Sequence, residues 1–266
     1  MLIESTVHLP VGFAFLDSVF HTPDGEALVR IVLRWAHFVA GVTWIGLLYF
    51  FNLVNVPVQK IMDADTKKKV NPDLLGRSLW YFRWGAVVTV LVGLTYYAMY
   101  ILKSDAVNAR SIGGGGRNIW VALLGWLLFP VVTFFVEFLI INKVPALTKD
   151  GRVFAVVVLV LVVLMALLVV WWLSSSFSVG DYTTSNKTFS IGIGGALGVI
   201  MLLNVWGIIW PAQKRILAGL QGGPAAAPEL ARRAFLASRT NAWLSLPMLF
   251  FMGTSHGDYV ILGRNS

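Results

Sequence analysis

The sequence predicts an all-α integral membrane bundle of about six transmembrane helices, with seven or eight left open. Hydrophobic residues make up 57% of the 266 residues and charged residues only 13%, and the mean hydropathy is +0.75. So little polar surface cannot cover a globule of this length in water. Several apolar runs also approach the roughly 20 residues that a helix needs to cross about 30 Å of hydrocarbon. We therefore expect lipid to surround most of the chain.

The chain divides into three regions, and the middle region contains six apolar runs. We expect an extracytoplasmic N-terminal segment over 1–29, a transmembrane helical domain over 30–258 and a short C-terminal tail over 259–266. Pro228 and Glu229 suit the start of the last helix, because proline is tolerated in the first turn and a carboxylate there favours the helix dipole. The expected spans are 30–56, 80–102, 118–141, 153–173, 189–210 and 236–256.

The runs differ in their polar residues. The fourth run contains no charged residue, whereas Arg83 interrupts the second run and Glu137 the third. The fifth run is rich in small residues, a pattern that lets a second helix or a flat cofactor approach the backbone closely, and helix packing is the favoured interpretation. It also contains Asn204, a candidate for a hydrogen bond to a neighbouring helix or to a ligand.

Basic residues are distributed unequally between the connections. The connections 57–79, 142–152 and 211–239 contain thirteen lysines and arginines, while the other connections, the tail and the start of the first helix contain seven. Because cytoplasmic loops are enriched in Lys and Arg, this asymmetry predicts that both termini lie outside the cytoplasm. We expect the membrane to be a bacterial inner membrane. The net charge of +8 is thereby explained by topology, and we expect no nucleic-acid partner.

The sequence has no cysteine. This excludes disulfides, thiolate metal sites, iron–sulfur clusters and the attachment of c-type haem within these residues. A redox centre would therefore need other ligands. Ionisable groups inside lipid are costly and indicate function. In the expected spans these groups are Arg34, His37, Arg83, Glu137 and His256, with Arg30 at the edge of the first span.

The first span carries a polar stripe. Arg30, Arg34, His37, Gly41 and Trp44 recur at steps of three and four residues, which puts them on one helical face. Such a face is expected to point into the bundle. Arg83 and Glu137 lie at comparable depth in their spans, which favours a structural ion pair over a proton route.

The predicted topology brings His37 and His256 to a similar depth near the outer face. Two imidazoles can ligate the iron of a b-type haem from opposite sides. Gly41, one turn from His37, would leave room for the porphyrin, and Arg30 and Arg34 are candidate partners of its propionates. The alternative is that His37 is a hydrogen-bonded packing residue and that His256 lies at the interface.

The two remaining histidines are not expected to bind haem. His8 and His21 lie in the outer polar segment, where we expect an exposed role. Because two intramembrane histidines suffice for one bis-histidine haem, we expect no second one within the bilayer.

Three segments carry a resemblance to a known family: RWAHFVAGVTWIGLLYFFNLVNVPVQ over 34–59, RSLWYFRWGA over 77–86 and NAWLSLPMLFFMGTSHG over 241–257. They resemble the membrane-bound urate oxidase N-terminal domain family. The first segment also resembles, more distantly, membrane protoporphyrinogen oxidases and copper-resistance membrane proteins, in which the corresponding histidine is associated with haem or metal.

The resemblance implies a membrane domain that oxidises urate without making hydrogen peroxide and delivers electrons to a c-type cytochrome, which family members carry fused at the C-terminus. The sequence ends at Ser266 without a cysteine, so we expect a separate c-type cytochrome as the acceptor. The anionic urate ring would need a basic or amide pocket, for which Arg30, Arg34 and Asn204 are the available groups.

Two other functions stay open. One is a non-catalytic haem-b subunit that anchors a larger respiratory or dehydrogenase complex and relays its electrons. The other is a structural or transport bundle without haem. Family resemblance does not separate them, because one scaffold is reused for different chemistry.

Overall fold

A computed structural model describes residues 21–256 and 260–265 of the chain. In this part the chain is helical apart from short connections and two isolated β-bridges. The predicted all-α membrane bundle is confirmed. His8 and the expected boundary between 258 and 259 lie outside the described residues.

The helices join into six rods in chain order. The first consists of α2 (Gly25–Tyr49), the π-helical η2 (Phe50–Asn55) and α3 (Val56–Ile61), and the second of α4 (Ala64–Tyr96), η3 (Tyr97–Leu102) and α5 (Lys103–Gly113). The third is α6 (Ile119–Lys143), followed by the single turn α7 (Pro145–Thr148) and the fourth rod, α8 (Gly151–Phe177). The fifth is α9 (Asn186–Asn204), η4 (Val205–Ile209) and α10 (Trp210–Leu220), and the sixth is α11 (Pro228–Thr254).

Five of these rods are long and apolar enough to cross a membrane, namely Gly25–Ile61, Ala64–Gly113, Ile119–Lys143, Gly151–Phe177 and Asn186–Leu220. The sixth, α11, was expected to span over 236–256 but is not among them, although it is 27 residues long. It begins at Pro228 with Glu229 in its first turn, as predicted.

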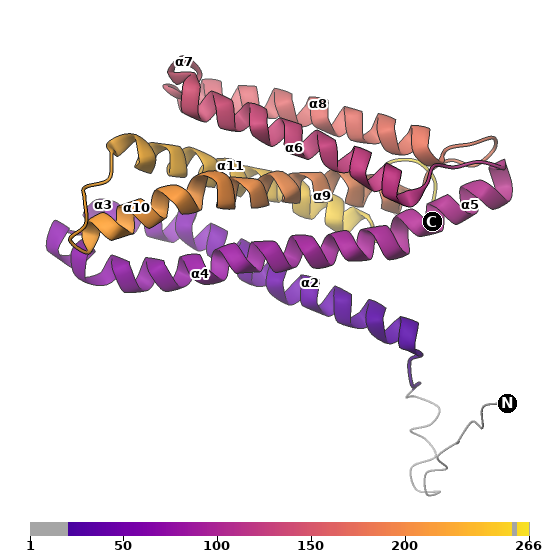
Figure 1. The fold of residues 1–266 in the computed structure, drawn as a ribbon, viewed down its shortest axis with the longest axis horizontal. Coiled ribbons are helices and arrows are strands. Elements are labelled where there is room, and N and C mark those ends of the chain that lie inside the picture. The colour runs from indigo at the N-terminus through magenta and orange to yellow at the C-terminus, as the bar shows by residue number, and fades with distance from the viewer. Residues whose placement is uncertain (1–20, 257–259, 266) are drawn as a thin grey trace, which may run out of the picture.

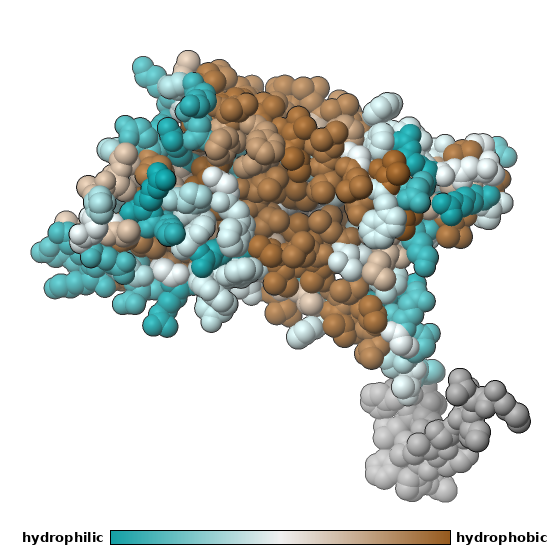
Figure 2. Space-filling model, in the orientation of Figure 1, coloured by the Kyte–Doolittle hydropathy of each residue, from teal (hydrophilic) through white to brown (hydrophobic). Residues whose placement is uncertain are grey.

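The rods run up and down side by side (Figure 1). The pair α6 and α8 lies on one side, the pair α2 and α4 on the other, and α9 with α11 between them. The start of α2 and the end of α11 emerge at the same end of the bundle. On the face shown in Figure 2, an apolar band crosses the middle of the bundle and hydrophilic residues cover both ends, which is the surface that a bilayer requires. Which end faces the cytoplasm stays a prediction.

Glycines let α9 occupy the centre. A Cβ on Gly192 would lie 2.6 Å from Leu173 Cδ1, and one on Gly194 would lie 3.2 Å from the Met248 carbonyl oxygen. The backbone of α9 and the neighbouring helices therefore lie closer together than a larger side chain at these two positions would allow. The prediction that these small residues serve helix packing is confirmed.

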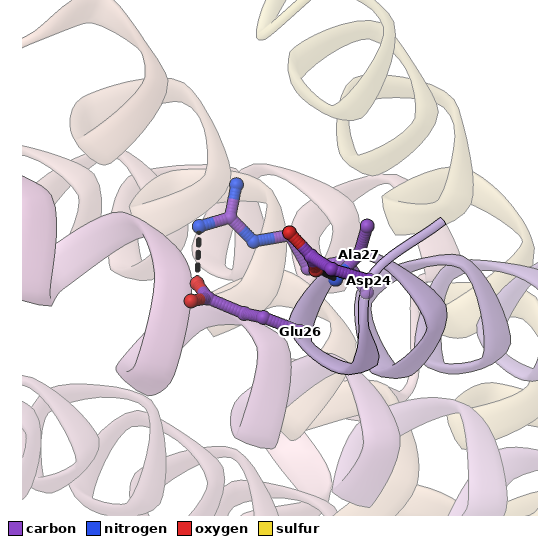
Figure 3. A network of polar contacts seen from close by, with 4 residues as sticks. Asp24, Glu26 and Ala27 are labelled. Atoms are coloured by element: carbon purple, nitrogen blue, oxygen red, sulfur yellow. Dashed lines mark hydrogen bonds and ion pairs between the residues drawn. The ribbon is translucent and has the colours of Figure 1, made fainter. Parts of the chain in front are cut away.

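Several helix boundaries differ from those expected. Helix α2 begins at Gly25 because Asp24 caps it, accepting a hydrogen bond from the Ala27 amide at 2.7 Å. Figure 3 shows this first turn, in which Glu26 also pairs with Arg30 at 2.6 Å. The prediction of a connection over 57–79 is wrong, because helices cover this stretch except at Met62 and Asp63. Hydropathy marks the apolar part of a helix and misses polar turns that continue it.

Candidate functional site

His37 lies between α2 and α4, half-buried. Its Nδ1 lies 2.8 Å from the Thr89 carbonyl oxygen. Because that oxygen only accepts, Nδ1 carries the proton, and in the neutral ring Nε2 keeps its lone pair. A Cβ on Gly93 would lie 2.9 Å from both Nδ1 and Cε1, so Gly93 leaves just enough room for the ring. No pattern in the sequence pointed to Thr89 or Gly93, which lie more than 50 residues from His37 in the chain.

The polar stripe was expected to point into the bundle. Trp44 is buried there, but Arg30 and Arg34 are exposed, so the expectation is wrong for the two arginines. Gly41 meets α4, since a Cβ there would lie 3.7 Å from Thr89 Cγ2. Arg30 pairs with Glu26 and its guanidinium carbon lies 4.6 Å from the centre of the Tyr100 ring. Arg34 is exposed and, among the described residues, forms no ion pair.

A shallow hollow opens beside Arg34 on the outer surface of α2. Its volume is about 600 Å³ and it is lined by Arg34, Trp35, Phe38, Val39, Val42 and Thr43. Apart from the arginine, the lining is almost wholly apolar. The hollow therefore suits an amphiphilic molecule with an anionic group better than a fully polar one.

His256 follows the end of α11 and is exposed. Its Nδ1 lies 2.8 Å from Ser255 Oγ and 3.3 Å from the Met252 carbonyl oxygen. These contacts engage Nδ1 and leave Nε2 facing away from them, as in His37. Helices α2 and α11 are joined farther along, where the Tyr49 and Ser245 hydroxyls lie 2.9 Å apart.

The predicted ion pair between Arg83 and Glu137 does not form. Arg83 stacks over the Trp210 ring, with its guanidinium carbon 3.8 Å from the ring centre, and the Trp206 indole donates to the Arg83 carbonyl oxygen at 3.3 Å. A face of an aromatic ring attracts a cation without requiring a carboxylate. The prediction relied on the similar depth of Arg83 and Glu137. It was wrong because their side chains point to different neighbours.

Glu137 instead belongs to a buried amide cluster between α6, α9 and α11. Asn204 Nδ2 lies 3.2 Å from each Glu137 carboxyl oxygen and donates to Asn241 Oδ1 at 3.0 Å. Asn241 Nδ2 donates to the Met201 carbonyl oxygen at 2.9 Å, and Thr240 adds a hydroxyl next to Glu137. The hydrogen bond expected from Asn204 to a neighbouring helix is confirmed. The Asn204 side chain is fully buried.

A second buried carboxyl, Asp105, joins α5 to the connection before α9. It accepts hydrogen bonds from the Tyr182 hydroxyl at 2.6 Å and from the Ser185 amide and hydroxyl, each at 3.0 Å. Arg264 stacks over the Tyr182 ring at 4.2 Å. Burial raises the pKa of Tyr182, and the Asp105 carboxylate raises it further. No sequence pattern predicted this cluster, because its members are far apart in the chain.

The residues present fit a b-type haem in part. Two imidazoles have Nδ1 engaged by oxygen acceptors, which is how proteins commonly orient a histidine whose Nε2 binds iron. Arg34 remains available to a propionate, whereas Arg30 already has a partner. No described contact joins the two histidines. Among the described residues, no group of three or more His, Cys, Asp or Glu residues gathers as it would around a bare metal ion.

Comparison with known proteins gives one match. Residues 64–264 match the family model described as Urate oxidase N-terminal. No curated protein and no solved structure matches the chain. The match begins with α4, so His37 and the stripe on α2 precede it, whereas Glu137, Asn204, Asn241 and His256 lie inside it.

Proposed function

Because this chain belongs to the Urate oxidase N-terminal family, we propose that it is a membrane-embedded b-haem redox protein that oxidises urate and passes the electrons to a c-type cytochrome. The observation that carries the haem assignment is the hydrogen bond from His37 Nδ1 to the Thr89 carbonyl oxygen. It fixes both the tautomer and the direction of Nε2. The acceptor lies outside these 266 residues, since none of them is a cysteine that attaches c-type haem.

The described residues divide the proposed function between them. His37 and His256 hold the haem through Nε2, and Arg34 pairs with a propionate or with the urate anion. When bound, the haem supplies one-electron transfer. The Thr89 carbonyl keeps the His37 ring in place, and the side chains that line the hollow beside Arg34 are mostly apolar. Asn204 is committed to Glu137 and Asn241, so the urate contact is assigned to Arg34.

The haem assignment is tested by reduced-minus-oxidised absorption spectra of purified protein. We expect a b-type band in the wild type, its loss in His37→Ala and its loss or shift in His256→Ala. His21→Ala is the matched control, because His21 is exposed and precedes α2. A wild-type spectrum without the band, from protein purified with haem supplied during expression, refutes the assignment.

Catalysis is tested separately by mixing purified protein with urate and an oxidised c-type cytochrome. Urate-dependent reduction of the cytochrome, weakened in Arg34→Ala, is the expected result. A wild-type protein with a b-type band and no such activity would instead be the non-catalytic haem-b subunit. The hollow at Arg34 favours this alternative, because its lining is almost wholly apolar apart from the arginine and so suits a polar urate ring poorly. Co-purification with stoichiometric respiratory or dehydrogenase subunits would then establish it.

A further inference from the structure

Glu137 is a buried carboxyl group that the proposed redox function does not use. It is 2% exposed and lies where α6 meets α9 and α11. Its hydrogen-bonding neighbours are the Asn204 amide, 3.2 Å from each carboxyl oxygen, and the Thr240 hydroxyl. All of these neighbours are neutral.

The charged groups on the surrounding helices are engaged elsewhere or lie at helix ends. Arg83 of α4 stacks over Trp210, and Arg239 of α11 lies over an aromatic ring of its own helix. Within the helices α8 and α9 the charged residues are Arg152 and Lys187, each in the first turn. In the described part of the chain, the single ion pair lies at the start of α2. Glu137 therefore has no cation to offset an ionised carboxylate.

The position of Glu137 makes ionisation unfavourable. An ionised carboxylate in a low-dielectric interior loses its hydration and needs a cation or several donors in exchange. Asp105, equally buried at 2% exposed, receives three donors. Glu137 receives fewer, and the Asn204 Oδ1 atom beside it is buried without a hydrogen-bond donor among the described residues. Acceptors outnumber donors in this cluster, and a proton on Glu137 supplies a donor.

The neighbouring side chains accommodate the carboxyl group with or without its proton. Asn204 Nδ2 is equidistant from the two oxygens, so it donates to whichever one lacks the proton. A threonine hydroxyl both donates and accepts, so Thr240 donates to a carboxylate and accepts from a carboxylic acid. The π-helical segment η4 also begins directly after Asn204, and π-turns inside helices are frequent at functional sites.

We propose that Glu137 is an intramembrane proton-binding site. The carboxyl group holds a proton in the resting protein, donates it in a hydrogen bond to the Thr240 hydroxyl, and releases it without rearrangement of the neighbouring side chains. Glu137 lies six residues before Lys143 at the end of α6, about 9 Å along the helix axis. The end of the bundle that carries α7 and α10 is therefore the end nearer to this proton.

Infrared spectroscopy of the purified full chain in lipid nanodiscs at neutral pH tests the site. We expect the carbonyl stretch of a protonated carboxylic acid in the wild type, a downshift of this band in D₂O, and its loss in Glu137→Gln. Thr240→Val is expected to keep the band and move it to higher frequency, because the acid loses its hydrogen-bond acceptor. Asp105→Asn is the matched control and is expected to leave the band unchanged.

Three results would overturn the proposal. The first is a wild type without the band, and the second is a band that survives in Glu137→Gln. The third is a band that disappears when sodium replaces choline at constant pH, which would make the cluster a cation site. The Gln side chain mimics the neutral acid, so Glu137→Gln is expected to keep the wild-type thermal midpoint. This readout does not depend on haem or urate, so it fails or succeeds independently of the proposed function.

Discussion

Asn204 and Asn241 meet in the interior of the bundle, where Asn204 Nδ2 donates to Asn241 Oδ1 over 3.0 Å. This bond joins α9 to α11, and the same Asn204 amide reaches Glu137 on α6. One side chain thus connects three helices. Both asparagines are fully buried, so no water replaces a lost partner without rearrangement.

Asn204→Ala is expected to destabilise the protein by about 1–3 kcal/mol, because it leaves Glu137 and Asn241 Oδ1 without their donor. The thermal unfolding midpoint in detergent measures the effect. Asn142→Ala is the control, since the Asn142 amide is half-buried and donates only to the Phe138 carbonyl of its own helix. Equal shifts in the two variants would show that the interhelical cluster adds no stability.

Gly93→Ala is expected to displace the His37 ring, because the added Cβ would lie 2.9 Å from two ring atoms. Overpacking of this kind costs about 1–3 kcal/mol. The b-type band, if His37 binds haem, should weaken or shift in parallel with a lower thermal midpoint. Gly76→Ala in the same helix has no atom within 4 Å of the new Cβ and should leave both unchanged. A normal b-type band in Gly93→Ala would show that haem binding does not depend on the position of the His37 ring.

Stability is expected to decrease above pH about 10 through Tyr182. Its pKa is raised above the ordinary value of 10.0, first by burial and then by the Asp105 carboxylate. The protonated phenol is therefore favoured in the folded state, and this contribution is complete below pH 10 and is lost as the pH rises through the folded pKa. Thermal midpoints measured between about pH 8 and 11 should decrease less steeply in Tyr182→Phe than in the wild type. The exposed Tyr81→Phe variant should follow the wild type.

The orientation in the membrane is testable because the sequence has no cysteine. A single cysteine at Lys187, which lies in the first turn of α9 and is half-buried, is expected to react with a membrane-impermeant maleimide in intact cells. One at Lys214 in α10 should react only after lysis, since the end of the bundle rich in basic residues is expected to face the cytoplasm. The reverse labelling pattern would invert the predicted topology.

The sequence alone determined the fold class, because hydropathy and length together require helices in lipid. It also predicted a span over 236–256, but α11 is not among the helices that are apolar enough to cross a membrane, and the structure shows why. Ser238 of this helix contacts η2 and Ser245 contacts α2, while Thr240 and Asn241 contact α6 and α9. These polar side chains are satisfied by other helices, so they lower the hydropathy of α11 without exposing a polar group to lipid.

For the candidate site, the sequence identified the residue types, since an ionisable side chain inside an apolar run is visible without any structure. It named His37, Glu137 and Asn204 but paired Glu137 with Arg83. Only the tertiary structure decided the partners: Thr89 for His37, Asn204 for Glu137 and Trp210 for Arg83. The physical reason is that hydropathy gives the depth of a residue along its helix, whereas a hydrogen bond depends on the rotation of two helices about their axes, which packing sets.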